Sequence, residues 1–216
     1  MERPVAILIA DLSGYTALTE AHGSIAAADL IDKYLGLVQK CLVGDSHIHE
    51  RVGDELMIVS SSPDCLLATA VMIGKQTSNE ENFLRIHGGL HYGSVLKRGG
   101  SYFGSALNLT SRIAAKANAG TYWCSDEFVN ALADKSMFTL ISKGNHLFKN
   151  ISEEKEMFEL YNEDQKTFYI DPVCHMLILE PKNAIPHPDE GDQFFCSSYC
   201  LEIYRKKNQG SFTKKG

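Results

Sequence analysis

Two aspartates in the N-terminal half of the chain occupy positions from which carboxylates can bind a metal ion. Asp11 directly follows an apolar run at residues 5–10, which predicts a buried strand. Asp54 follows Gly53 at the tip of a predicted hairpin. Either acid alone is also typical of a solvated turn, and it is their neighbours that favour a metal site.

The residues after Asp11 predict a turn that leads from the strand into a helix. This turn consists of Leu12, Ser13, Gly14, Tyr15 and Thr16. Free backbone N–H groups at the start of a helix can hold a phosphate group. Two carboxylates beside such a turn suit Mg²⁺ or Mn²⁺ that bridges the oxygens of a polyphosphate.

Glu50 is a carboxylate inside a predicted strand. Alternation along the strand places it on one face with Ile48 and Val52, the expected inner face. A carboxylate between two apolar neighbours needs either a nearby arginine or a ligand that offers hydrogen-bond donors. The sequence is compatible with both.

Three further polar side chains are unremarkable alone. Asn108 and Arg112 are four residues apart on a predicted helix and therefore share a face. Lys149 follows a strand-like segment at residues 146–148. Each of them is also typical of a solvated surface.

Four segments that contain these residues resemble the class III nucleotidyl cyclase domain. They are residues 7–16, 52–57, 87–93 and 102–112, in the order and at the spacing of that family. The resemblance covers about residues 4–161. It implies a ferredoxin-like βαββαβ core that works as a homodimer, with active sites at the interface.

The resemblance also implies a role for each matching residue. Asp11, Asp54 and the backbone of Leu12 would bind two divalent ions in one protomer. Asn108 of the other protomer would orient the ribose, and its Arg112 would stabilise charge on the transferring phosphate.

Lys149 occupies the position of a phosphate-binding lysine of the family, although the glycine that follows it there is Asn150 here. The implied reaction is attack of the ribose 3′-oxygen of a nucleoside triphosphate on the α-phosphorus. It yields the 3′,5′-cyclic monophosphate and pyrophosphate.

Two residues bear on the choice of base. Adenylate cyclases usually have Lys where this chain has Glu50, and Asp or Thr where it has Ser101, whereas guanylate cyclases have Glu and a small residue. A carboxylate accepts hydrogen bonds from guanine N1–H and N2–H₂, but adenine N1 is itself an acceptor. We therefore expect GTP to be favoured over ATP. The alternative is a catalytically silent, cyclase-like sensor of nucleotide or metal.

Three cysteines crowd into the last fifth of the chain. Cys174, Cys196 and Cys200 have the spacing C-x21-C-x3-C, and residues 169–208 resemble the YHS domain, a small treble-clef-like module related to metal-handling TRASH motifs. His175 replaces the usual glycine of that family and adds a possible ligand. We expect Zn²⁺ or another soft ion such as Cu(I) at this site.

The fourth ligand of that site is not determined by the sequence. The candidates for it are Asp171, His175 and His187. The alternative to a metal site is a small core in which reduced cysteines pack with aromatic side chains.

The composition is that of a globular protein and excludes several classes of function. Of the 216 residues, 44% are hydrophobic and 22% charged, unlike a disordered chain. The net charge of -6 argues against general binding of nucleic acid or of an anionic membrane. The sequence has no apolar run of about 18 residues, the length that predicts a membrane span. Without a secretory signal pattern or a disulfide framework, we expect a reduced, cytoplasmic protein.

The hydrophobic pattern predicts an α+β fold with a mixed, largely antiparallel sheet. Helices are predicted at residues 24–42, 66–73 and 104–119, and strands at 5–10, 47–61 (a hairpin) and 83–96. Gly120 is the expected end of the third helix. Gly89 and its neighbouring glycines predict that another element approaches the third strand region closely. A shift in composition near residue 165 predicts two domains, residues 1–164 and a Cys-rich module with a basic tail at 165–216.

Overall fold

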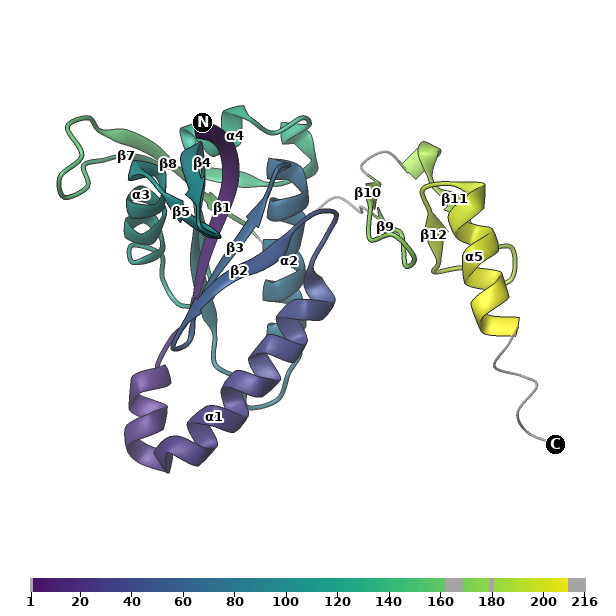
Figure 1. Ribbon diagram of the computed structural model, residues 1–216, viewed down its shortest axis with the longest axis horizontal. Coiled ribbons are helices and arrows are strands. Elements are labelled where there is room, and N and C mark those ends of the chain that lie inside the picture. Colours follow the sequence, from purple (N-terminus) through teal and green to yellow (C-terminus); the bar gives the residue numbers. More distant parts are fainter. Residues whose placement is uncertain (1, 162–168, 179–180, 210–216) are drawn as a thin grey trace. The chain divides into compact units, whose positions relative to one another are not determined.

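The structure is a computed structural model that describes residues 2–161, 169–178 and 181–209 (Figure 1). The chain divides into two units, Met1–Gln165 and Lys166–Gly216. The predicted domain boundary at residues 164 and 165 falls on residues outside the described ranges.

The N-terminal unit is built on one sheet. Its strands are β1 (Glu2–Leu12), β2 (His47–Val52), β3 (Glu55–Ser60), β4 (Ile86–Arg98), β5 (Ser101–Phe103), β6 (Tyr122–Ser125), β7 (Leu140–His146) and β8 (Lys155–Leu160). The strand order is β2-β3-β1-β4-β6-β8-β7, with β5 paired to β4. The β4–β6 pair is parallel, and the other pairs between the described strands are antiparallel. The predicted α+β fold with a mixed, largely antiparallel sheet is confirmed.

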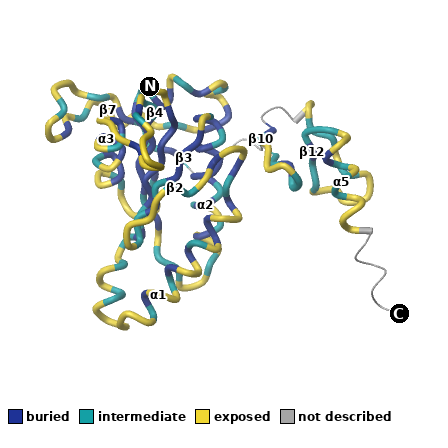
Figure 2. The backbone as a smooth tube through the Cα atoms, viewed as in Figure 1, coloured by how far each residue is buried: buried dark blue, intermediate teal, exposed yellow. Residues whose placement is uncertain are grey.

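The helices of this unit pack on the sheet or on one another. They are α1 (Tyr15–Cys41), α2 (Pro63–Ser78), α3 (Ser105–Ala114), α4 (Asp126–Asn130) and a short 3₁₀ helix at Lys135–Met137. Residues 5–10 of β1 are all buried, and Figure 2 shows this strand as a buried segment of the sheet. Consecutive buried residues on a strand require cover on both faces. Helix α3 contacts β1 and β4, while α2 contacts β1 and β3.

Gly89 determines how closely α3 approaches the sheet. A Cβ atom at Gly89 would lie 2.4 Å from the backbone nitrogen of Ala114 and 2.6 Å from the carbonyl oxygen of Thr110. The helix therefore packs directly on the β4 backbone, as the glycines of this segment predicted. This contact fixes the inner face of α3 and leaves Asn108 on the exposed side.

Two helix boundaries differ from the prediction. Helix α3 ends at Ala114, because the N–H groups of Lys116 and Ala117 bond to carbonyls only three residues back, which tightens the chain. Gly120 has a positive φ of 86° but does not cap the helix; its N–H bonds to the Ile86 carbonyl of β4. Helix α1 starts earlier than predicted and is broken at Gly23, where φ is 82°.

The C-terminal unit consists of two short strand pairs and a helix. Its elements are β9 (Tyr169–Ile170), β10 (Leu177–Ile178), a 3₁₀ helix (Pro181–Asn183), β11 (Ile185–Pro186), β12 (Phe194–Phe195) and α5 (Ser198–Gln209). Strand β9 pairs with β10, and β11 pairs with β12, in both cases antiparallel. Phe195 is fully buried and packs edge-on against Tyr204 of α5 at 5.2 Å between ring centroids. The likeness to a treble clef stays a prediction.

Among the described residues, no helix combines the length and the apolar character that crossing a membrane requires.

Candidate functional site

The structure brings Asp11 and Asp54 together. Asp11 is at the end of β1, and Asp54 lies in the turn between β2 and β3. Because β3 pairs with β1, with Leu56 opposite Ala10, the hairpin turn lies beside the end of β1. The two carboxyl groups are close enough to share a hydrogen bond. Burial, followed by the bond to Asp11 and its negative charge, raises the pKa of Asp54 to about 6.

A pair of neighbouring carboxylates is a good fit for divalent cations. Each negative charge disfavours the other, and a cation between them removes this repulsion. The Leu12 N–H donates a hydrogen bond of 3.0 Å to Asp11 Oδ1 and also bonds to Asp54, so the backbone helps to orient both acids. The role of the Leu12 backbone as a metal ligand stays a prediction.

The turn after Asp11 has the geometry of a helix start. Gly14 adopts a φ of 93° just before α1, and no side chain caps the helix there. The first N–H groups of a helix have no partner within it, so those of Tyr15 and Thr16 suit a phosphate oxygen. The Ser13 N–H is not free to hold a phosphate, contrary to the sequence prediction for this turn, because it donates to the Arg85 carbonyl oxygen at 2.8 Å.

His87 is a site residue that the sequence analysis did not select. It lies opposite Asp11 in the β1–β4 register, and its Nε2 is 3.9 Å from Asp11 Oδ2. Its Nδ1 is 2.9 Å from Ser13 Oγ. Burial lowers the pKa of His87 and so favours the neutral ring, although Asp54 acts in the opposite direction. The antiparallel register of β1 and β4 was the signal that could have found it.

Helix α3 carries Asn108 and Arg112 away from the sheet. Asn108 is exposed and Arg112 is half-buried, while Ala106, Thr110 and Ile113 form the buried side. No hydrogen bond or ion pair within the described residues engages the two polar side chains, nor does any described contact join them to Asp11 or Asp54. They are therefore free to bind a partner from outside the unit.

Lys149 is exposed. The residue after it, Asn150, stands where the cyclase family has a glycine, and its backbone conformation explains why asparagine is accepted there. Asn150 has a φ of 61°, the left-handed backbone conformation that glycine adopts most easily. Asparagine is among the side chains that tolerate this conformation best. The chain therefore keeps the turn after Lys149 without the glycine.

The prediction that Glu50 lies on an inner, apolar face is wrong. Strand β2 is at the edge of the sheet, where Glu50 is exposed and Val52 is 65% exposed. An irregularity in the β2–β3 register between Ile48 and Glu50 also breaks the alternation. Ser101 is likewise exposed, at the start of β5.

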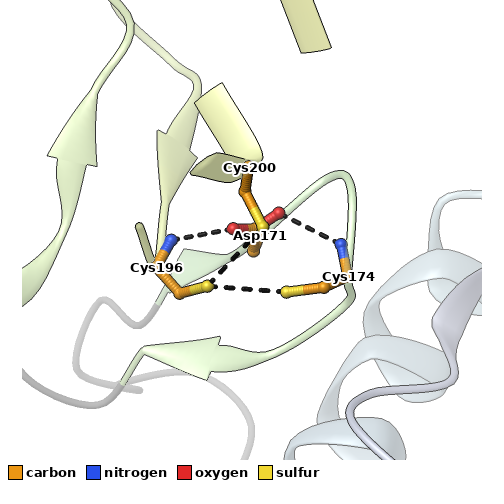
Figure 3. Close-up of side chains that lie close together, drawn as sticks. All are labelled: Asp171, Cys174, Cys196 and Cys200. Carbon is orange, nitrogen blue, oxygen red and sulfur yellow. Dashed lines mark hydrogen bonds between the residues drawn. The ribbon is translucent and has the colours of Figure 1, made fainter. Parts of the chain in front are cut away.

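In the C-terminal unit, three thiols and one carboxylate converge (Figure 3). The candidate ligand atoms of Asp171, Cys174, Cys196 and Cys200 all lie within 4.8 Å of one another. Cys174 Sγ is 3.5 Å from Cys196 Sγ, which is 3.8 Å from Cys200 Sγ. His175, a predicted ligand, is exposed and is not part of this group.

The Asp171 carboxylate is held by backbone N–H groups. It is fully buried; Oδ1 accepts from Val173 and Cys174 at 2.8 and 3.2 Å, and Oδ2 accepts from Cys196 at 2.8 Å. Burial opposes ionisation of Asp171, but the hydrogen bonds outweigh it and the pKa is lowered. Burial, then the Asp171 carboxylate and the Cys174 thiol, raise the pKa of Cys196 to about 12. Such mutually repelling groups are the environment that a bound cation stabilises.

The sequence is similar to bacterial proteins, some of which are adenylate cyclases. An uncharacterized protein of Mycobacterium bovis is 31% identical over 154 residues, which are 71% of this chain and 40% of that protein. A pH-sensitive adenylate cyclase of Mycobacterium tuberculosis is 30% identical over 132 residues, 61% of this chain and 33% of that protein. The chain thus spans less than half the length of these relatives. No protein-family model matches the chain.

Solved cyclase structures share the fold. A structure of adenylate cyclase from Trypanosoma brucei in its monomeric state superposes with a TM-score of 0.69 at 18% identity, over 76% of this chain and 92% of that one. The guanylate cyclase domain from Catenaria anguillulae, solved in complex with GTP, has a TM-score of 0.63 at 17% identity, over 77% of this chain and 100% of that one. Likeness at such identities is evidence for the fold.

Proposed function

We propose that the N-terminal unit, which shares the fold of solved cyclase structures and is similar in sequence to a bacterial adenylate cyclase, converts a nucleoside triphosphate into the 3′,5′-cyclic monophosphate and pyrophosphate. The observation that carries this proposal is the contact between Asp11 and Asp54 beside the uncapped start of α1. A binding protein without turnover has no need for a second carboxylate that raises the pKa of Asp54 at this position.

Each residue of the site has a separate role in the proposed reaction. The carboxylates of Asp11 and Asp54 bind two Mg²⁺ or Mn²⁺ ions, and the N–H groups of Tyr15 and Thr16 hold phosphate oxygens. When bound, such ions stabilise the attacking ribose oxygen and the charge on the leaving pyrophosphate. His87 orients Asp11 from the neighbouring strand.

A second copy of the chain completes the site. Asn108 and Arg112 project from the exposed side of α3, and in the proposed homodimer they reach the nucleotide bound to the partner. Asn108 orients the ribose, and Arg112 stabilises the charge that develops on the transferring phosphate. Lys149 contributes a further positive charge to the triphosphate.

Glu50 selects the base in this proposal, together with Ser101. No ion pair engages Glu50 within the described residues, so its carboxylate is available to a ligand. Guanine offers two donors to one carboxylate, whereas adenine presents an acceptor at the same edge. The substrate is therefore GTP in preference to ATP.

Incubation of the purified chain with Mn²⁺ and each of ATP, GTP, CTP and UTP tests the activity. Chromatography should reveal a cyclic monophosphate and an equal amount of pyrophosphate, with GTP as the best substrate. Binding of nucleotide without any product would instead identify a silent sensor. An Asp29→Asn variant, which changes an exposed acid of α1, serves as a matched control.

The C-terminal unit supports a second function, the binding of a soft cation by Cys174, Cys196 and Cys200. Three sulfur atoms that converge within bonding distance of one ion favour this over a core of packed thiols. Metal analysis of the purified chain should find one Zn²⁺ or Cu(I) per chain. The triple replacement of these cysteines by serine should abolish binding and leave cyclase turnover measurable.

A further inference from the structure

Two of the sulfur–sulfur distances in the cluster are compatible with a tetrahedral ion. With metal–sulfur bonds of about 2.3 Å, two sulfurs of a tetrahedral site lie about 3.8 Å apart, and two sulfurs of a planar three-coordinate site about 4.0 Å apart. The observed distances are 3.5 Å from Cys174 to Cys196 and 3.8 Å from Cys196 to Cys200. They fit an ion of tetrahedral preference, such as Zn²⁺, better than a planar one.

Asp171 is poorly placed to supply the fourth corner. A carboxylate has about four lone-pair positions, and three backbone N–H groups already occupy positions on Asp171. Figure 3 shows two of these bonds, from Cys174 and Cys196. These bonds tie the turn that carries Cys174 to the strand end that carries Cys196. Binding of an ion would leave Asp171 only its one remaining lone-pair position, in a fully buried environment where these bonds are costly to disturb. Asp171 therefore has a structural role: its hydrogen bonds link the two segments that carry the cysteines.

The imidazoles of His175 and His187 both lie outside the cluster of ligand atoms. His187 Nδ1 accepts hydrogen bonds from the N–H groups of Asp189 and Glu190 at 3.2 and 3.1 Å, and its ring packs near Tyr204. The His175 side chain is exposed, outside the cluster of ligand atoms. Within the described residues, the cluster contains three thiols and no imidazole.

We propose that the three thiolates alone bind a tetrahedral ion and that its fourth position is open to a neutral nitrogen donor, an imidazole, from outside the chain. This rests on the proposed metal binding of the C-terminal unit. Structural zinc sites are closed by four protein ligands, whereas sites that exchange a ligand keep one position open. Cys174 is exposed, so an incoming group can reach the ion from its side.

The charges at the site select a neutral donor. Three thiolates around a divalent ion leave one negative charge, and the buried Asp171 carboxylate adds another nearby. A fourth anionic ligand such as a thiolate would meet repulsion from both, but an imidazole would not. The site thus suits a histidine side chain of a partner protein, for which free imidazole is the simplest probe.

Replacement of the native ion by Co²⁺ in the full chain tests this proposal by absorption spectroscopy. We expect thiolate charge-transfer bands and the visible bands of a tetrahedral ion. Imidazole should shift the visible bands with a saturable dependence and leave the thiolate bands in place, and 2-mercaptoethanol should bind more weakly. Cys174→Ser should reduce the thiolate bands, and Asp171→Asn should keep both the spectrum and the imidazole response while lowering the melting temperature.

Each other outcome contradicts a distinct statement. An absence of cobalt bands would overturn the metal function itself. Cobalt bands that imidazole does not shift would show a closed site and overturn only the open position. His175→Ala and Asp171→Asn then identify the residue that closes it, because the responsible variant gains an imidazole response. Should Asp171→Asn fail to fold, the imidazole titration of the unaltered chain decides alone.

Discussion

The imidazole of His49 packs on the ring of Tyr102 with 4.4 Å between the ring centroids. This contact joins β2, at the edge of the sheet, to β5, which pairs only with β4 among the described strands. Glu50 and Ser101 are the immediate neighbours of the two stacked residues, and both are exposed. The stack therefore brings together the two strands that carry the proposed base-reading residues.

Exchange of the base-reading pair should shift the preference from GTP toward ATP. In the double variant Glu50→Lys with Ser101→Asp, the lysine donates to adenine N1 and the aspartate accepts from the N6 amino group. A mismatched polar contact costs about 1–3 kcal/mol, roughly tenfold to a hundredfold in preference. The measurement is the ratio of kcat/KM for GTP and ATP in both proteins. A parent chain that already prefers ATP, or a ratio that does not move, would contradict the role of Glu50.

Loss of either carboxylate of the proposed metal site should abolish turnover. Asp11→Ala and Asp54→Ala each remove one side of the acid pair, and we expect a loss of about a hundredfold or more in kcat. The melting temperature should change little, because removal of one acid also removes repulsion between the two. Full activity in a well-folded Asp11→Ala or Asp54→Ala variant would rule out the assignment, and Asp29→Asn controls for a general effect of charge.

Two inactive variants should restore activity when they are mixed. If Asp11 and Arg112 act from different protomers, a mixed dimer of Asp11→Ala and Arg112→Ala contains one site with both residues intact. Turnover should then reach up to about one quarter of the unaltered rate, since half of the dimers are mixed and each has one complete site of two. Native mass spectrometry establishes that the subunits exchange. Exchange without any recovery would exclude a shared site.

Gly89 and Gly36 should respond to alanine in opposite directions. Gly89→Ala places a methyl group against backbone atoms of α3 and should destabilise the chain by about 1–3 kcal/mol or more. Gly36 lies inside α1, where an added Cβ atom would meet nothing within 4 Å, so Gly36→Ala should stabilise the chain by up to about 1 kcal/mol through helix propensity. Urea unfolding measures both. Equal effects of the two variants would contradict the close packing of α3 on β4.

The fold was largely predictable because its signals are local. The apolar run at residues 5–10 and the Gly53–Asp54 turn each follow from neighbouring residues, and both are present. The end of α3 was not predictable, because it depends on the N–H groups of Lys116 and Ala117, which bond to carbonyls only three residues back. The exposure of Glu50 depends on a register irregularity and on an edge position, and neither leaves a pattern in the sequence.

Some residues of the candidate sites were likewise predictable from local sequence, and others were not. The acids Asp11 and Asp54 were identified by their positions at a strand end and a turn. His87 became visible only through the register of β1 and β4. Asp171 was one of three possible fourth ligands, and its bonds to backbone N–H groups on two segments favour a different role. Such bonds are a property of the folded backbone, which residue types and spacing do not specify.

The ion pair between Glu127 and Lys155 should make stability depend on pH in the acidic range. Lys155 Nζ lies 2.6 Å from Glu127 Oε1, and His91 Nδ1 lies 3.8 Å from Oε2. Burial acts to raise the pKa of Glu127, but the bonds to Lys155 and Asp126 lower it to about 2, from an ordinary value of 4.5. The folded state thus binds the proton more weakly than the unfolded state. The stabilisation is complete above pH 4.5 and is lost as the pH falls toward 2.

The Lys155→Met variant should therefore lose less stability than the parent on acidification, because protonation of Glu127 then contributes less to that loss. Without the ammonium group, the pKa of Glu127 returns toward its ordinary value, so the folded and unfolded states differ less in proton affinity. We expect the variant to be less stable than the parent at about pH 6, and the difference to narrow at about pH 3. Thermal unfolding at both pH values gives the two differences, and Lys143→Met, which removes the partner of Glu159, is a matched control. A difference that stays constant between the two pH values would show that Lys155 does not set the ionisation of Glu127.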